Sequence, residues 1–151
     1  MGKTQTTTSS DARRVQTKPV SIKPNLRNQQ RAEVSADITI EQQDGNRLSC
    51  TMVNLSRSGV MISCDLETLK ILIPEQRTPA PGQWIPIRTR FTVPVVAQQP
   101  VLIVADASIV HMRRIARNEF HLGIQFVEFE GNGYNYVDLY VRKLLGNSLN
   151  T

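Results

Sequence analysis

Two arginines four positions apart, Arg27 and Arg31, stand where a polar amino-terminal stretch gives way to an alternating apolar pattern. The arginine side chain presents a fixed fork of donors that suits phosphate oxygens and the O6/N7 edge of guanine, and its flat face can stack on a base. The same spacing recurs at Arg113 and Arg117. Because an arginine pair beside a strand is usually solvated surface, the spacing alone does not indicate a binding site.

A second feature, the stretch NLSRSG at 54–59, begins 23 residues after Arg31. Asn, Ser and Gly are ordinary turn formers, so this stretch alone predicts only a hairpin turn. The arginine pair followed by this turn, across a strand and a hairpin, is a more specific pattern. No such turn follows Arg113 and Arg117, and we expect those two side chains to be surface.

The net charge of +5 is unevenly distributed along the 151 residues. Residues 1–31 contain seven basic residues and one acidic residue, whereas the other 120 carry a net charge of −1. A protein that binds long nucleic acid should spread its basic residues along a groove, with stacking aromatics between them. Aromatics are only 5% of this chain, so we do not expect long nucleic acid as a partner.

Apolar runs such as VLIVA at 101–105 are far shorter than the roughly 20 residues of a spanning helix, and the first residues are polar. We therefore expect a cytoplasmic protein without membrane insertion. Cys50 and Cys64 form no CxxC pair and are expected to be small buried groups. His111 and His121, taken with these cysteines, match no compact zinc pattern, so no metal site is predicted.

The chain divides into a tail and a folded body. Residues 1–24 have few large apolar side chains and are predicted to be a flexible, disordered basic tail. From residue 32 apolar and polar residues alternate with the period of a half-buried strand, and QDGN at 43–46 predicts a tight hairpin turn. Further strands are expected around residues 48–52, 60–64, 85–93, 101–112 and 119–129, with a short helical turn at DLETLKIL.

The last element predicted is a helix that places Tyr134, Val137, Val141 and Leu144 at helical spacing and ends at Gly146. Arg88 and Arg90 are predicted to face outward from their strand. Six short antiparallel strands leave few exposed edges when they close on themselves. The sequence thus predicts an all-β fold, a six-stranded antiparallel β-barrel with a C-terminal α-helix.

The order Arg-x-x-x-Arg, strand, Asn-x-Ser-x-x-Gly resembles the PilZ domain family, the bacterial receptors for cyclic di-GMP. HLGIQF at 121–126 is similar to the family's late strand, and the likeness extends over roughly residues 25–147, which we take as one domain. The resemblance implies a non-enzymatic six-stranded barrel that holds its ligand between the arginine segment and the barrel surface, with no cofactor.

The resemblance implies that the ligand-binding residues of this sequence are Arg27, Arg31, Asn54, Ser56 and Gly59. The arginines would hold phosphates and guanines, Asn54 would accept hydrogen bonds from guanine, and Ser56 would add a hydroxyl. Gly59 would allow a backbone shape that a side chain forbids and would keep space open.

Two other classes of function are weighed beside the receptor. One is a PilZ-like scaffold that acts only through protein contacts, without ligand; the intact motifs favour the receptor over it. The other is an enzyme, for which we find no nucleophile–base pair, glycine-rich phosphate loop or paired acids. For the receptor, we expect ligand binding to order the segment from about Pro24 to Arg31 and so relay occupancy to an unidentified effector protein.

Overall fold

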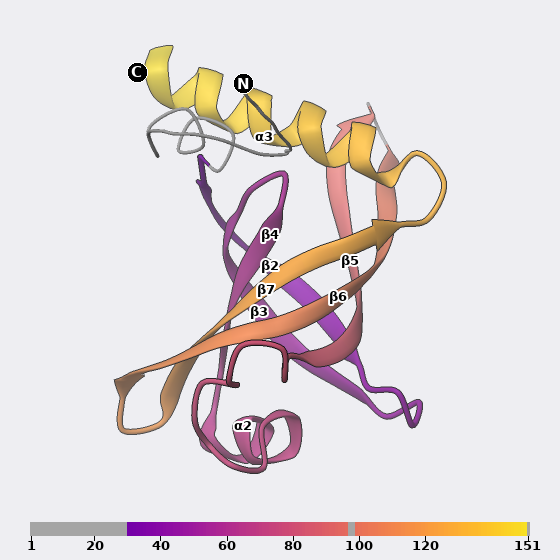
Figure 1. The fold of residues 1–151 in the computed structure, drawn as a ribbon. Helices are drawn as coiled ribbons and strands as arrows, with labels where there is room; N and C mark the ends of the chain where they lie inside the picture. Colours follow the sequence, from indigo (N-terminus) through magenta and orange to yellow (C-terminus); the bar gives the residue numbers. More distant parts are fainter. Residues whose placement is uncertain (1–29, 97–98, 151) are drawn as a thin grey trace, which may run out of the picture. The chain divides into compact units, whose positions relative to one another are not determined.

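Six antiparallel strands close into a barrel in the computed structural model, which describes residues 30–96 and 99–150 (Figure 1). The strand order around the barrel is β2-β3-β4-β7-β6-β5, which confirms the predicted fold class. The predicted tail, residues 1–24, lies outside the described residues. In chain order the elements are β2 (Ala32–Glu41), β3 (Arg47–Leu55), β4 (Gly59–Cys64), α2 (Leu66–Leu72), β5 (Ile85–Val96), β6 (Gln99–Ala116), β7 (Glu119–Phe129) and α3 (Gly133–Asn150).

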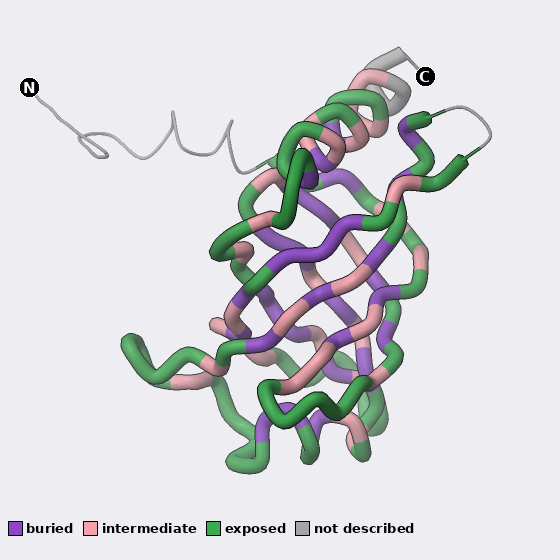
Figure 2. The backbone as a smooth tube through the Cα atoms, turned by 90° about the vertical axis from the view of Figure 1, so that its right-hand side faces the viewer, coloured by how far each residue is buried: buried purple, intermediate pink, exposed green. Residues whose placement is uncertain are grey.

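The core lies inside the barrel because every second residue of each strand points inward. Figure 2 shows buried and exposed positions following one another along the strands. Cys50 and Cys64 are buried free thiols, as expected. Side chains with almost no exposure come from all six strands, among them Ile38, Met52, Ile62, Val93, Ile103 and Leu122.

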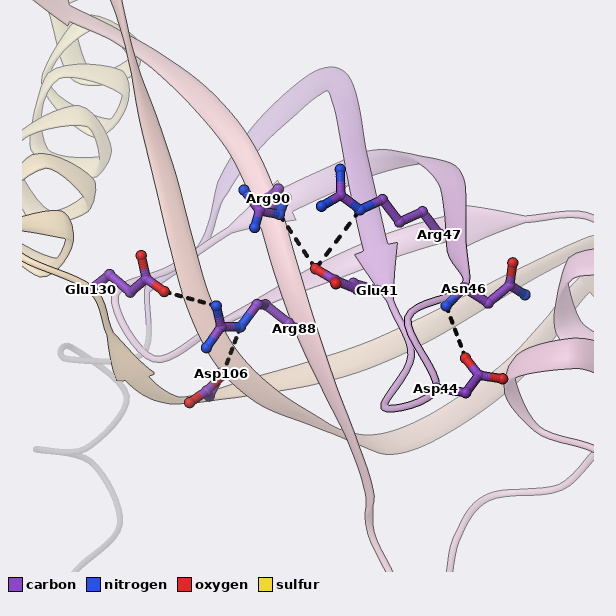
Figure 3. A network of polar contacts seen from close by, with 8 residues as sticks. All are labelled: Glu41, Asp44, Asn46, Arg47, Arg88, Arg90, Asp106 and Glu130. Atoms are coloured by element: carbon purple, nitrogen blue, oxygen red, sulfur yellow. Dashed lines mark hydrogen bonds and ion pairs between the residues drawn. The ribbon is translucent and has the colours of Figure 1, made fainter.

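The barrel closes where β2 meets β5, through three residue pairs from Thr39↔Arg90 to Glu41↔Arg88. Charged side chains link the strands on the outer surface of this seam, as Figure 3 shows. Glu41 Oε1 accepts a hydrogen bond of 3.4 Å from Arg90 and lies 3.9 Å from Nε of Arg47, on the other side of β2. The prediction that Arg90 faces outward is therefore confirmed. Its charge is paired with that of Glu41 on the outer surface of the barrel.

Arg88, also predicted to face outward, bridges two acidic side chains on the same surface (Figure 3). Its Nε donates to Asp106 at 3.1 Å and its Nη1 donates to Glu130 at 2.8 Å. Arg88 thereby connects β5 to β6 and to the residue that follows β7. Both arginines of β5, Arg88 and Arg90, are thus paired with carboxylates.

The β2–β3 connection is the tight turn that the Asp-Gly pair predicts. Gly45 N donates to Gln42 O at 2.9 Å, and Gln42 N donates to Asn46 O at 2.8 Å, which encloses three residues. Gly45 has a φ of 92°, in the left-handed region that glycine adopts without steric cost. Strand pairing then runs from Glu41↔Arg47 toward the far ends of both strands.

Helix α2 is the short helical turn predicted after β4. Its N-cap is Asp65, whose carboxylate accepts a hydrogen bond from Thr68 N at 2.9 Å. That bond, together with the position at a helix N-terminus, holds the pKa of the Asp65 carboxyl below its usual value. The buried Leu69 and Leu72 fasten this helix to the core.

Helix α3 contacts β5, β6 and β2 (Figure 1), and Val137 and Val141 on its inner face are fully buried. The prediction that it ends at Gly146 is wrong, because the helix continues to Asn150. A glycine ends a helix when it takes the left-handed conformation, and Gly146 does not have a positive φ. Tyr134 is 48% exposed and packs edge-on against Phe129, with ring centroids 5.9 Å apart.

Candidate ligand-binding site

Arg31 and Asn54, from the two motifs found in the sequence, are in direct contact. Arg31 Nη1 donates a hydrogen bond of 2.9 Å to Asn54 Oδ1. Arg31 immediately precedes β2, and Asn54 lies near the end of β3, where the antiparallel pair Glu33↔Asn54 brings the two segments together. A carboxamide oxygen can accept two hydrogen bonds, so Asn54 keeps capacity for a ligand donor.

Arg31 is exposed and no described carboxylate is paired with it. This distinguishes it from Arg57, Arg88 and Arg90, which each pair with an acidic side chain. Arg27, its partner in the sequence motif, lies outside the described residues. Arg113 and Arg117 are exposed on the β6–β7 hairpin, as predicted.

The turn between β3 and β4 is organised around the hydroxyl of Ser56. Ser56 Oγ accepts hydrogen bonds from Gly59 N at 3.1 Å and Ser58 N at 3.2 Å, and lies within donating distance of Gly59 O at 3.2 Å. The Ser56 side chain has no exposed surface. The sequence-based interpretation gave this hydroxyl to the ligand, whereas in the structure it is buried and bonded within the turn.

Gly59 stands where two backbones come unusually close. A Cβ at this position would lie 2.2 Å from the carbonyl oxygen of Ile124 in β7, a distance that no real Cβ contact shows. Its φ is not positive, so the glycine is required by close packing of β4 against β7 and not by an unusual backbone shape. The structure thus gives a reason for Gly59 that differs from the one expected.

Arg57 lies inside the turn and links it to α3, a role that the sequence analysis does not predict. Its Nε donates a hydrogen bond to Oδ1 of Asp138, which also pairs with Arg142 at 3.2 Å. The bond from Arg57 holds the pKa of the Asp138 carboxyl below its usual value, and the nearby charge of Arg142 lowers it further. The spacing of Asp138 and Arg142, four residues along a helix, was the only signal in the sequence.

The cysteines do not contribute a reactive group to this surface. Burial raises the pKa of Cys50 to about 12 and that of Cys64 to about 11, so both remain protonated thiols near neutral pH. Within residues 30–96 and 99–150, no group of three His, Cys, Asp or Glu side chains is arranged to hold a metal ion. What the site offers is an arginine, an amide and a rigid turn, which is the chemistry of anion and base recognition.

Solved structures with the same fold come from several bacteria. The inhibitor of motility MotI/DgrA of Bacillus subtilis matches with a TM-score of 0.59 and 11% identity, over 80% of this chain and 50% of that one. MrkH of K. pneumonia in its apo state gives 0.53 and 12%, over 80% and 50%. The PilZ domain of Escherichia coli YcgR, solved with c-di-GMP, gives 0.50 and 11%, over 81% and 93%.

This chain therefore spans about half the length of MotI/DgrA and of MrkH and nearly all of the YcgR domain. At such low identity the likeness establishes the fold alone. Comparison with curated protein sequences gives no match. None of the described helices is both long and apolar enough to cross a membrane.

Comparison of the sequence with models of protein families assigns the chain to a family. The model of the PilZ domain matches residues 25–143, a range that contains both motifs and every strand of the barrel. Because this range is more than half of the sequence, the chain belongs to the PilZ domain family.

Proposed function

We propose that this protein is a non-enzymatic receptor for cyclic di-GMP that binds its ligand through Arg27, Arg31 and Asn54, with Ser56 and Gly59 of the same motif holding the turn in place. The single observation that carries the proposal is the hydrogen bond of 2.9 Å between Arg31 and Asn54. It joins residues from two separate sequence motifs at one exposed place on a PilZ barrel. The PilZ domain of YcgR, a structural neighbour, was solved with c-di-GMP.

The residues take two kinds of role. Arg31 and Arg27 grip phosphate and guanine through charged, bidentate hydrogen bonds and stacking, and Asn54 accepts from a guanine donor. Ser56 and Gly59 act on the ligand indirectly, because the Ser56 hydroxyl is used inside the turn and Gly59 is packed against β7. Their work is to hold Asn54 and the turn backbone in place.

Signalling follows from ordering of the arginine segment. Residues 1–31 carry seven positive charges and one negative charge, so they repel one another before ligand is present. Two ligand phosphates neutralise part of that charge and tether both arginines, which orders the segment from about Pro24 to Arg31 against the barrel. An effector protein, not identified by this sequence, then recognises the ordered segment or the surface that it covers.

Isothermal titration of the full chain with cyclic di-GMP, cyclic di-AMP and GTP tests the proposal. We expect saturable binding of cyclic di-GMP alone, and chromatography of the recovered nucleotide should show that it is unchanged. If high micromolar cyclic di-GMP produces neither heat nor chemical-shift changes, the receptor function is wrong, and the alternative of a scaffold that acts only through protein contacts is favoured. Turnover of the nucleotide would contradict the non-enzymatic role.

A further inference from the structure

Strands β6 and β7 continue past the barrel as a two-stranded arm, which we define as residues 110–119. β5 begins at Ile85, opposite Ile109, so β7 is the only strand of the described residues that pairs with β6 beyond that point. On the other side of the hairpin, β4 ends at Cys64, opposite Phe120. Figure 1 shows the orange hairpin of β6 and β7 reaching beyond the neighbouring strands.

The arginine in the middle of the arm holds its tip together. The guanidinium of Arg114 lies over the ring of Phe120, 5.7 Å from its centroid. The same group donates hydrogen bonds of 3.2 Å to the carbonyl oxygens of Ala116 and Arg117. An isolated two-stranded hairpin is only marginally stable in water, so these contacts supply order that strand pairing alone does not.

Two further contacts fasten the arm to the segments beside it. Asn118 Oδ1, at the tip, accepts a hydrogen bond of 2.9 Å from Leu66 N at the start of α2. Met112 N donates to Thr78 Oγ1 at 3.2 Å, and that hydroxyl donates to Met112 O at 3.0 Å. The arm is therefore held in one position before any partner arrives, which lowers the entropy cost of binding to it.

The arm presents charged groups that the fold does not use. Arg113 and Arg117 are exposed, and in the part of the chain that the structure describes no carboxylate pairs with either. Ile115, between them in sequence, is 43% exposed. Glu119, the one acidic residue of the arm, lies 3.4 Å from Nε2 of His121. Two unpaired guanidinium groups and one apolar side chain are thus left on a rigid projection.

This combination fits protein carboxylates better than a phosphate surface. Anionic membranes are recognised by clusters of about four to eight basic residues, and single-stranded nucleic acids by basic grooves with exposed stacking aromatics. The arm contains three arginines, and the aromatic ring beside them, that of Phe120, is buried under Arg114. Arginine forks pair bidentately with carboxylates, and arginine is enriched at protein interfaces.

We propose that the arm is a docking surface for an acidic segment of a partner protein. Two carboxylates of that segment pair with Arg113 and Arg117, and an apolar side chain between them packs on Ile115. The inference stands apart from the proposed function, because no residue of the arm belongs to the two ligand motifs.

NMR of the ¹⁵N-labelled full chain tests this surface with a synthetic peptide, acetyl-Glu-Glu-Leu-Glu-Glu-amide. We expect saturable chemical-shift changes of the amides of residues 111–119. The same peptide with glutamine at every glutamate position should cause none, because the contact needs carboxylates. Absence of shifts at millimolar peptide, or shifts confined to residues outside the arm, would overturn the proposal.

Matched double variants separate a local contact from attraction to the net charge. Arg113→Ala/Arg117→Ala should weaken peptide binding about 2- to 30-fold, the range for loss of two surface ion pairs. Arg13→Ala/Arg14→Ala removes the same charge from the amino-terminal stretch and should bind the peptide like wild type. Equal weakening by both double variants would overturn the proposal. Thermal unfolding should confirm that the exposed substitutions leave the fold intact.

The same variants distinguish the other classes of partner. If Arg113→Ala/Arg117→Ala lowers binding to phosphatidylserine vesicles or to duplex DNA and leaves peptide affinity unchanged, the arm recognises phosphates and the proposal is wrong. Cyclic di-GMP affinity should be the same in this variant and in wild type. Failure of the chain to bind cyclic di-GMP would overturn the receptor function alone, whereas failure to bind the acidic peptide would overturn only the docking surface.

Discussion

Arg57 in the β3–β4 turn and Asp138 in helix α3, 81 residues apart in sequence, are joined by a hydrogen-bonded ion pair. Both side chains are about three-quarters buried, at 23% and 26% exposure. Asp138 also holds Arg142 one helical turn further on. The turn that contains Ser56 and directly follows the end of β3, where Asn54 lies, is thus linked to the terminal helix.

Replacement of Asp138 by Asn should lower the free energy of unfolding by about 1 kcal/mol at neutral pH. The folded-state pKa of Asp138 is depressed, so the stabilisation is complete above the unfolded value of about 4 and is lost as the pH falls through the folded value. Urea unfolding from pH 7 downward should show the wild-type and variant curves converging in acid. Asp37→Asn, at an exposed position of β2, is the control. A difference that stays constant with pH would contradict the ion-pair origin.

Arg31→Ala and Arg27→Ala should each weaken cyclic di-GMP binding by roughly thirty-fold to several-hundred-fold. Each removes hydrogen bonds to charged groups of about 1.5–3 kcal/mol and some stacking. The free energy of unfolding should hardly change, because the Arg31–Asn54 bond is exposed. Isothermal titration measures the affinities, with Arg117→Ala on the β6–β7 hairpin as control. Unchanged affinity in both variants would refute the assigned roles.

Ser56→Ala should destabilise the free protein by about 1–3 kcal/mol, since two backbone amides lose a buried acceptor. Ligand affinity should fall as a consequence of the loosened turn. Ser58→Ala, at an exposed position of the same turn, should change stability much less. Urea unfolding and titration of both variants check this. Lost affinity with unchanged stability would mean that Ser56 instead contacts the ligand.

Gly59→Ala should cost about 1–3 kcal/mol of stability, because the new methyl group must push β4 away from the Ile124 carbonyl. Gly146→Ala offers a control of opposite sign: nothing lies within 4 Å of its Cβ position, and alanine in a helix is more stable than glycine by about 0.5–1 kcal/mol. Both changes are measured by urea unfolding. A neutral Gly59→Ala would show that the two strands separate easily there.

Amide hydrogen exchange across residues 20–32 should detect ordering of the arginine segment. We expect protection to appear with saturating cyclic di-GMP in wild type and to disappear in Arg27→Ala, because both arginines must be tethered at once. Amides that exchange equally fast with and without ligand, or that are already protected in the free protein, would rule out this relay while leaving binding intact.

Most of the fold follows from local sequence patterns. The alternation from residue 32 onward assigns strands and inward faces, because a strand with one buried face must repeat every two residues. Asp44-Gly45 marks its turn correctly, since glycine at a positive φ is a local requirement. The end of α3 does not follow from Gly146, because a glycine can either cap a helix or continue it, and which of the two occurs depends on its backbone φ angle.

The candidate site, like the fold, could be predicted from the sequence only in part. Residue types and their order predict a site of Arg27, Arg31, Asn54, Ser56 and Gly59, because anion and base recognition needs arginine and amide groups and turns need serine and glycine. Their individual roles depend on pairing between distant strands. β4 pairs with β7, so Gly59 meets Ile124 and Met61 meets Gly123, while Arg57 reaches α3. The sequence by itself determined the strands, the family motifs and the charge of the tail; only the closed barrel, through its long-range register, decided which side chains touch.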